Sequence, residues 1–199
     1  MTDLLVATNN PGKLDEFRRL LTSLPVTVVS PAEAGIELDV PEPHPEYAEN
    51  ARDKARTFCE ASGLLTLADD SGIEVAALDW GPGARSARFG GPGIQDRAAF
   101  LLAQVGNATD RRARMVCWLA LAIPERPTPR VELFSGTVEG TLAARPRGTG
   151  GFGYDPVFQL PSGLTTAELP AARKDEISHR GRAVAAAAPR IRELAALKV

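Results

Sequence analysis

Cysteine and histidine are scarce in this sequence. The 199 residues contain two cysteines, Cys59 and Cys117, and two histidines, with no C-x-x-C pair and no Cys/His spacing that would hold zinc. A chain of this length buries a core without disulfide staples. We therefore expect two buried thiols in a reducing compartment.

Long apolar runs and an excess of one charge are also absent. No stretch approaches the roughly 18 apolar residues that a membrane span needs. The start, MTDLLVATNN, lacks the basic leader and the cleavage site of a signal peptide. A formal net charge of −2 argues against a general nucleic-acid or membrane-surface binder. We expect a cytoplasmic protein that binds neither nucleic acid nor membrane.

Internal repeats and low-complexity linkers are missing too, which favours a single domain over residues 1–199. The early pattern predicts alternating elements, with strands at 3–8, 26–30 and 64–68 and helices at 13–23 and from Tyr47 to Gly63. Gly63 is a typical helix stop. We expect the third strand to end where the acidic pair Asp69 and Asp70 begins.

The second half of the chain has a different pattern. It predicts, in order, a Gly/Pro-rich loop at 79–93, a helix at about 95–105, two long antiparallel strands at 112–123 and 130–143, and a short strand at 157–160. The Ala-rich tail from Ser178 predicts a helix, which Pro189 should kink or split because it cannot donate to the carbonyl of Ala185. The whole pattern favours an α/β fold with a mixed central β-sheet flanked by helices.

The segment TNNPGK follows the first strand and opens the first helix. It consists of Thr8, Asn9, Asn10, Pro11, Gly12 and Lys13. Such a turn aims backbone N–H groups and a helix N-terminus at one point, which suits a phosphate, and the lysine adds positive charge. It is not a Walker A loop, because the first glycine is missing and Leu14 stands where Ser or Thr is needed. An ordinary strand–helix turn with a surface lysine is the alternative.

The stretch LTLADDSGIEV, residues 65–75, carries two adjacent acids after an apolar run. Carboxylates at the carboxyl end of a strand lie where open α/β sheets bind ligands, and there they hold a hard cation or act as a base. Neighbouring strand residues point to opposite faces, so Asp69 and Asp70 should do different jobs. The alternative is an acidic turn in which Asp70 or Ser71 caps a following helix.

The segment GTGGFGYDP matches the spacing G-x-G-x-x-G at residues 148–153. A dinucleotide fingerprint is excluded, because Pro156 leads into an extended segment and not into a helix. An aromatic ring and a carboxylate, here Phe152 and Asp155, suit a stacked and hydrogen-bonded nucleobase. A tight turn with a core phenylalanine is the alternative.

Two further groups of residues are weaker signals. Asn50 and Lys54 share one helix face downstream of Glu42, and basic residues gather near the start of the last helix, namely Arg173, Lys174, His179, Arg180 and Arg182. Each group is also what a solvated surface face looks like. Together with the turn, the acids and the aromatic loop, they form the inventory of a nucleoside-triphosphate site with a bound Mg²⁺.

These residues resemble the inosine/xanthosine triphosphate pyrophosphatases, which hydrolyse non-standard purine nucleotides. The segments ATNNPGK, YAENARDKA, ADDSG, PGARSARFGG, GTGGFGYDP and KDEISHRG are similar to the motifs of that family, in its order. The resemblance covers nearly the whole chain. It implies a Mg²⁺-dependent enzyme that converts ITP, dITP and XTP to monophosphate and pyrophosphate and so sanitises the nucleotide pool. It also implies an elongated mixed sheet with two lobes, a cleft between them, and a homodimer.

The resemblance also implies roles for individual residues. Thr8, Asn9, Asn10, Pro11, Gly12 and Lys13 would bind the triphosphate, and Glu42 and Asp70 would hold the metal. Asp70 would be the general base, assisted by Lys13, with Ser71 as a substrate contact. Base recognition would fall to Phe152, Gly153, Tyr154 and Asp155. Further substrate contacts would be Lys54, Lys174, His179 and Arg180.

The expected mechanism is an in-line attack of water on the α-phosphorus, with Lys13 and Arg180 stabilising negative charge. Two other interpretations stay open. The Maf-like pyrophosphatases are similar in the triphosphate turn but act on other nucleotides. A nucleotide sensor would bind a nucleotide without turnover. It would not need the set of acidic residues that this chain has, so that set argues against a sensor.

Overall fold

The computed structural model describes residues 1–93 and 95–197. Its elements follow the order β1 (Thr2–Val6), α1 (Pro11–Leu21), β2 (Val26–Val29), α2 (Tyr47–Ser62), β3 (Leu65–Val75), η1 (Ala76–Leu78), β4 (Gly81–Pro82), η2 (Gly83–Arg88), α3 (Arg97–Val105), β5 (Arg112–Ile123), β6 (Arg130–Leu142), β7 (Phe158–Gln159), η3 (Thr166–Glu168), α4 (Ala171–Ile177) and α5 (His179–Ala196). In the described ranges, no helix is both long enough and apolar enough to cross a bilayer.

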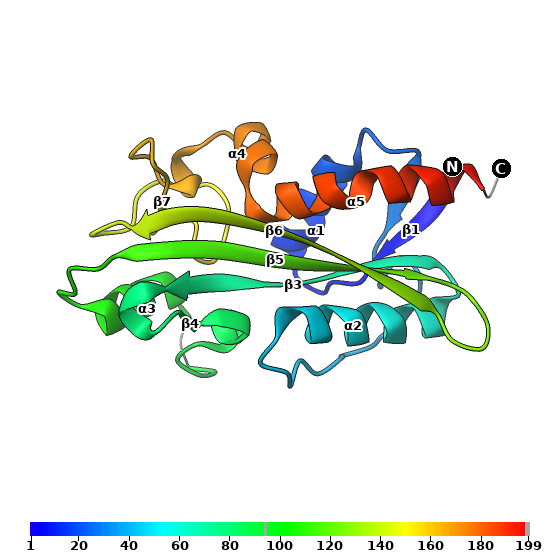
Figure 1. Cartoon of the computed structure of the whole chain (residues 1–199), viewed down its shortest axis with the longest axis horizontal. Helices are drawn as coiled ribbons and strands as arrows, with labels where there is room; N and C mark the ends of the chain where they lie inside the picture. Colours follow the sequence, from blue (N-terminus) through cyan, green and yellow to red (C-terminus); the bar gives the residue numbers. More distant parts are fainter. Residues whose placement is uncertain (94, 198–199) are drawn as a thin grey trace.

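The strands of the described chain form one mixed sheet. Its order is β2-β1-β3-β5-β6-β7, with β4 beside β3. Strand β1 runs parallel to β2 and β3, whereas β3 with β5 and β5 with β6 are antiparallel. Figure 1 shows β3, β5 and β6 along the length of the molecule, with α2 on one side and α1 and α5 on the other. The mixed sheet flanked by helices is confirmed.

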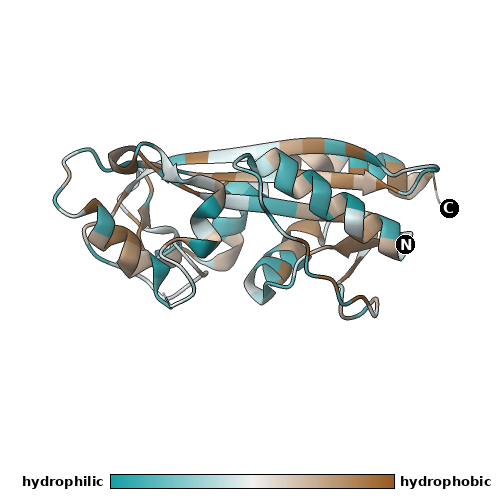
Figure 2. Cartoon of the chain, turned by 90° about the horizontal axis from the view of Figure 1, so that it is seen from below, coloured by the Kyte–Doolittle hydropathy of each residue, from teal (hydrophilic) through white to brown (hydrophobic). Residues whose placement is uncertain are grey.

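The two faces of the sheet follow from side-chain alternation along β3 and β5. Odd-numbered residues such as Leu67 and Leu119 pack in a cluster with α1 and α5. Even-numbered residues are small, for example Ala68 and Ala120, and pack against α2. Hydrophilic residues lie on the outer sides of the helices (Figure 2). The alternation places Asp69 on the α1/α5 face and Asp70 on the α2 face.

The third strand was predicted wrongly. Strand β3 does not end at the acidic pair but continues through it to Val75. Its pairing with β1 ends at Leu67, whereas its pairing with β5 runs on from Thr66 to Val75. Pairing with the antiparallel strand β5 therefore keeps the backbone of β3 extended after the pairing with the parallel strand β1 has ended. The acids lie at the edge of the parallel part of the sheet, in the middle of β3.

Two smaller expectations also need correction. The region 79–93 is not all loop, since it contains β4 and the 3-10 helix η2. The helix predicted from Ser178 is confirmed as α5, whose N-cap is Ser178, and it is preceded by a short helix, α4, that was not predicted. Helix α5 runs through Pro189 without being split. Both cysteines are buried, as expected.

Gly136 lets α5 approach the sheet closely. It lies in β6, opposite Cys117 of β5, which in turn pairs with Ser71 of β3. A Cβ at this position would stand 2.2 Å from the carbonyl oxygen of His179 and 2.6 Å from the amide nitrogen of Ala183. The bare backbone of Gly136 is therefore what allows the first turn of α5 to lie over the middle of the sheet.

We expect Gly136→Ala to destabilise the protein by roughly 1–3 kcal/mol, because the added methyl group overpacks the contact between α5 and β6. Thermal unfolding would show this as a fall of several degrees in Tm. The neighbouring exposed residue provides the control: Ser135→Ala should leave Tm nearly unchanged. Equal Tm values for the two variants would contradict the close packing.

Candidate active site

A cavity of about 630 Å³ opens between the N-terminus of α1, the middle of β3, the loop at 152–155 and the α4–α5 junction. Most of the residues singled out from the sequence line it: Asn10, Pro11, Gly12, Lys13, Glu42, Asp70, Ser71, Phe152, Gly153, Tyr154, Asp155, Lys174, His179 and Arg180. Thr8, Asn9 and Lys54 are not among its lining residues. The fold thus brings together segments from both ends of the chain.

The turn before α1 is built by its own side chains. The Asn10 side chain caps the helix by accepting a hydrogen bond from the amide of Lys13 at 3.1 Å, and Pro11 occupies the first turn. Thr8 Oγ1 accepts from the amide of Asn10, and Asn9 donates to the carbonyl of Leu38. Thr8 and Asn9 shape the turn from outside the cavity, and the helix N-terminus faces into it.

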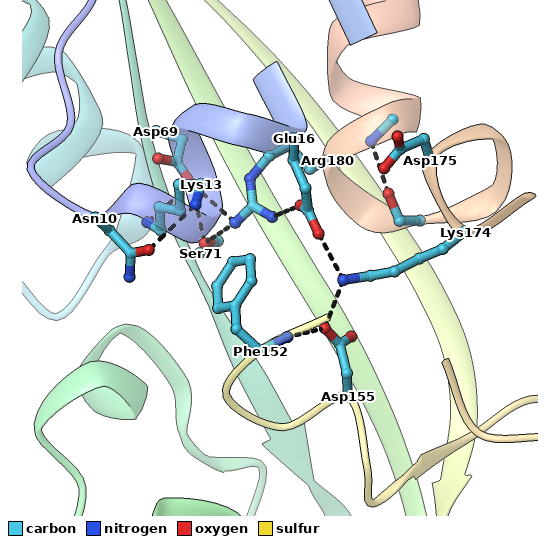
Figure 3. A network of polar contacts seen from close by, with 12 residues as sticks. Asn10, Lys13, Glu16, Asp69, Ser71, Phe152, Asp155, Lys174, Asp175 and Arg180 are labelled. Carbon is cyan, nitrogen blue, oxygen red and sulfur yellow. Dashed lines mark hydrogen bonds and ion pairs between the residues drawn. The ribbon is translucent and has the colours of Figure 1, made fainter. Parts of the chain in front are cut away.

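Asp69 is the counter-charge for cations from two elements. Its Oδ2 lies 2.9 Å from Lys13 Nζ, 3.2 Å from Arg180 Nη2 and 3.0 Å from Ser71 Oγ. Burial opposes ionisation, but Lys13, Arg180 and Lys54 outweigh it and hold the pKa of Asp69 well below its usual range. Figure 3 shows Asp69, Lys13, Ser71 and Arg180 converging. Asp69 is thus an ionised, buried support and not a lining residue.

Asp70 points to the α2 face of the sheet, where its surroundings differ from those of Asp69. Asn50 donates to its Oδ2 at 2.9 Å, and the amide of Ser71 donates to its Oδ1. Burial, together with the negative charge of Glu42, raises the pKa of Asp70 to about 6. A carboxylate that titrates near neutrality and lines a cavity suits a general base or a cation ligand.

Glu42 lies between two positively charged partners. Its carboxylate contacts Lys54 Nζ and lies 3.3 Å from Arg88 Nη1. Lys54 also donates to the backbone carbonyl of Asp69 at 2.9 Å. The helix face that carries Asn50 and Lys54 is therefore turned toward the acidic pair and not toward solvent.

The loop at 152–155 meets the phosphate-type turn directly. A Cβ at Gly12 would stand 2.7 Å from Cδ1 of Phe152, so the ring rests against the bare backbone of the turn. Lys174 Nζ and the guanidinium carbon of Arg180 lie 5.2 and 5.6 Å from the ring centroid. Asp155 accepts from the Phe152 amide at 2.8 Å and from Lys174 at 2.5 Å. The aromatic ring is thus framed by cations.

Glu16 is a site residue that the sequence reasoning missed. It is buried, its Oε1 lies 2.5 Å from Lys174 Nζ, and its other oxygen contacts Arg180 Nη1. The only local signal is its position one turn after Lys13 on α1, since both partners are more than 150 residues away. A second such pair, Arg19 with Asp175 at 2.6 Å, also joins α1 to α4.

The basic cluster of the tail divides between the cavity and the surface. Lys174, His179 and Arg180 are buried and line the cavity. Arg173 and Arg182 are exposed, and they contact Glu176 and the carbonyl of Thr137. Burial and the neighbouring Arg180 and Lys174 hold the pKa of His179 well below its usual range, so its ring is neutral at pH 7. His44, from which no role was expected, pairs with Asp53.

The wall opposite the turn was also missed. It is formed by Ser86 and Ala87 of η2, by Gln95, Asp96 and Arg97 at the start of α3, and by Met115 of β5. Ser86 and Ala87 lie within the Gly/Pro-rich segment at 79–93, and Gln95, Asp96 and Arg97 come directly after it. The path of this segment in the fold has no local signature in the sequence.

Three comparisons relate the chain to known proteins. A sequence profile of the Ham1 family matches residues 4–190. A dITP/XTP pyrophosphatase of Streptomyces coelicolor is 45% identical over 203 residues, covering 98% of this chain and 99% of the relative. One from Syntrophobacter fumaroxidans is 44% identical over 91% of this chain and 78% of its own length.

Solved structures give the same result. A HAM1 protein from Coxiella burnetii superposes with a TM-score of 0.81 at 35% identity and covers 100% of this chain and 98% of that chain. A nucleoside-triphosphatase, dITP/XTP pyrophosphatase, from Mycobacterium abscessus has a TM-score of 0.73 at 41% identity and covers 94% of this chain and 100% of that chain.

We expect Asp70 to make the metal-free protein more stable as the pH falls from 7 to 5. Its pKa in the fold, about 6, lies above the ordinary 3.8, so its stabilising contribution is complete below 3.8 and is lost as the pH rises through 6. The gain between pH 7 and pH 5 is about 1 kcal/mol.

Thermal unfolding in a chelator tests this expectation, with Asp70→Asn as the comparison. On going from pH 7 to pH 5, the Tm of the wild type should rise by roughly 2–4 °C relative to that of the variant. The contributions of the other titrating groups to the pH dependence of Tm are shared by the two proteins and cancel in this difference. Identical pH dependences in the two proteins would show that Asp70 is not perturbed.

Proposed function

The chain belongs to the Ham1 family, and from that premise we propose that it is a Mg²⁺-dependent pyrophosphohydrolase for deaminated purine nucleoside triphosphates. The substrates would be ITP, dITP and XTP, and the products a nucleoside monophosphate and pyrophosphate. The relatives named dITP/XTP pyrophosphatase support this choice of substrates.

One observation carries the proposal: a single cavity brings together two chemically different groups of residues. The first group is the α1 N-terminus, Lys13 and the carboxylates of Glu42 and Asp70. In the second group, Phe152 is bracketed by Asp155, Lys174 and Arg180. The first group suits phosphates and the second suits a planar base. A volume of about 630 Å³ is in the range of small-molecule sites.

The carboxylates fit a Mg²⁺ ion that arrives with the nucleotide. Among the described residues, no group of three or more His, Cys, Asp or Glu side chains is placed to hold a metal alone. Glu42 and Asp70 both line the cavity, and the charge of Glu42 contributes to the raised pKa of Asp70. Mg²⁺ commonly takes one or two carboxylates plus substrate phosphates. When bound by these two residues, it would supply charge neutralisation at the phosphate oxygens.

In the proposed reaction, Asp70 orients a water molecule and accepts its proton. The water oxygen forms a bond to the α-phosphorus, and the bond from that phosphorus to the bridging oxygen of pyrophosphate breaks. A pKa near 6 leaves Asp70 ionised at pH 7 yet basic enough to take the proton. Lys13 and the α1 N-terminus balance charge on the phosphates. Ser71, hydrogen-bonded to both Asp69 and Arg180, is a further substrate contact.

Selectivity would arise at the purine 6-position. Inosine and xanthosine carry a carbonyl acceptor there, whereas adenine carries an amine. Lys174 and Arg180 are donors without acceptor capacity, and their buried carboxylate partners hold them beside Phe152. An amine facing such donors would leave buried N–H groups unpaired, which costs binding energy. We therefore assign Arg180 to base recognition in this proposal.

A homodimer in the cytoplasm, where nucleotide pools are sanitised, completes the proposal. The dimer rests on the family resemblance. Light scattering after size-exclusion chromatography would measure the mass of the assembly, for which the proposal requires twice that of the chain.

Pyrophosphate release from ITP, XTP, ATP and GTP, with and without Mg²⁺, tests the activity. We expect ITP and XTP to be preferred and turnover to require Mg²⁺. Asp70→Asn should lower the rate by roughly 10²–10⁴, the contribution of a general base. Asp15→Asn removes an exposed carboxylate from α1 and is the matched control.

Each arm of this assay has an outcome that would overturn part of the proposal. Near-normal ITP hydrolysis by Asp70→Asn would exclude the base assignment. Preference for a modified pyrimidine would favour a Maf-like activity, and nucleotide binding without turnover by the wild type would indicate a sensor.

A further inference from the structure

Arg97 faces the cavity from the wall opposite the phosphate-type turn. It is the first residue of α3, whose N-terminus is capped by the Asp96 side chain accepting from the amide of Ala99 at 2.9 Å. The guanidinium lines the same cavity as Asn10 and Lys13, although α3 lies near the C-terminal end of β3, away from α1 (Figure 1). Its charge also reaches Tyr154, whose pKa it acts to lower against the larger, raising effect of burial.

The other cations of the cavity are already neutralised by carboxylates. Lys13 pairs with Asp69 at 2.9 Å, and Lys174 lies 2.5 Å from both Glu16 and Asp155. Arg180 contacts Glu16 and Asp69. Two further cations, Lys54 and Arg88, both pair with Glu42.

Arg97 differs from all of these. Within residues 1–93 and 95–197, it has no carboxylate within ion-pair distance and no hydrogen-bond partner for its side chain. Its Nε is buried and unpartnered. A half-buried guanidinium with an unsatisfied N–H, set in the wall of a cavity, lacks the acceptor that such groups normally have.

The missing acceptor is most simply an anion in the cavity. A triphosphate carries several negative charges, and a site whose other cations are paired with protein carboxylates has little net positive charge to offer it. A guanidinium matches phosphate oxygens with two parallel N–H donors and stays charged at any working pH. The hypoxanthine base of ITP is neutral and has no comparable need for this charge.

We propose that Arg97 is a substrate-binding residue that holds the phosphate chain of the nucleotide from the wall opposite Lys13. The assignment deepens the proposed function and rests on it for the identity of the nucleotide. Its consequence is that the phosphates are held between α1 and α3, two elements that are far apart in the sequence.

The test compares Arg97→Gln with Arg126→Gln. Arg126 is exposed in the β5–β6 turn, outside the cavity, so its variant loses the same charge without the contact. Arg97→Gln should raise the KM for ITP on the order of 10- to 100-fold, since a charge-assisted hydrogen bond is lost. Tm should stay within a few degrees of wild type, and Arg97→Lys should recover part of the affinity. Arg126→Gln should behave as wild type.

Competitive inhibitors separate a phosphate contact from a general change of cleft shape. Inorganic tripolyphosphate should lose affinity in Arg97→Gln by a factor similar to that for ITP, while inosine, which has no phosphate, should be unaffected. An unchanged KM, or an equal loss for inosine, would overturn the assignment. If the wild type bound tripolyphosphate through Arg97 but released no pyrophosphate, the proposed function would fail and the anion contact would stand.

Discussion

The candidate site depends on one buried carboxylate, that of Asp69. A single oxygen of this side chain lies within 3.2 Å of Lys13, Arg180 and Ser71, which come from α1, α5 and β3. Without that negative charge, two cations would face each other in a buried space, which is strongly unfavourable. Glu16 extends the same arrangement to Lys174. Asp69 thus lets a phosphate-type turn and a cationic base pocket share one cavity.

The acidic pair divides because strand alternation turns its members to opposite faces, and each face has its own chemistry. Asp69 meets cations that keep it ionised, whereas burial and the repelling charge of Glu42 raise the pKa of Asp70 against the hydrogen bond from Asn50. The cost of that repulsion is what a bound cation would relieve. Gly136 contributes from two strands away, because only a bare backbone lets α5 bring Arg180 down to the sheet.

Local pattern predicted much of this arrangement. The turn at 8–13 and the opposite orientations of Asp69 and Asp70 depend on spacing along a few residues, so they can be predicted from the local sequence. The length of β3 does not, because its continuation to Val75 is imposed by pairing with β5. Glu16 and Arg97 could not be found for the same reason: their significance comes from partners, or a cavity, assembled by segments far away in the chain.

The central claim is that Asp69 acts as the shared counter-charge of Lys13 and Arg180, and the kcat/KM of Asp69→Asn for ITP tests it most directly. Asparagine keeps the shape of the side chain and removes its charge. The account predicts a folded protein whose kcat/KM falls by about 100-fold or more, since displaced binding groups cost catalysis steeply. Asp15→Asn should retain the wild-type value. A folded Asp69→Asn protein with wild-type kcat/KM would contradict the account.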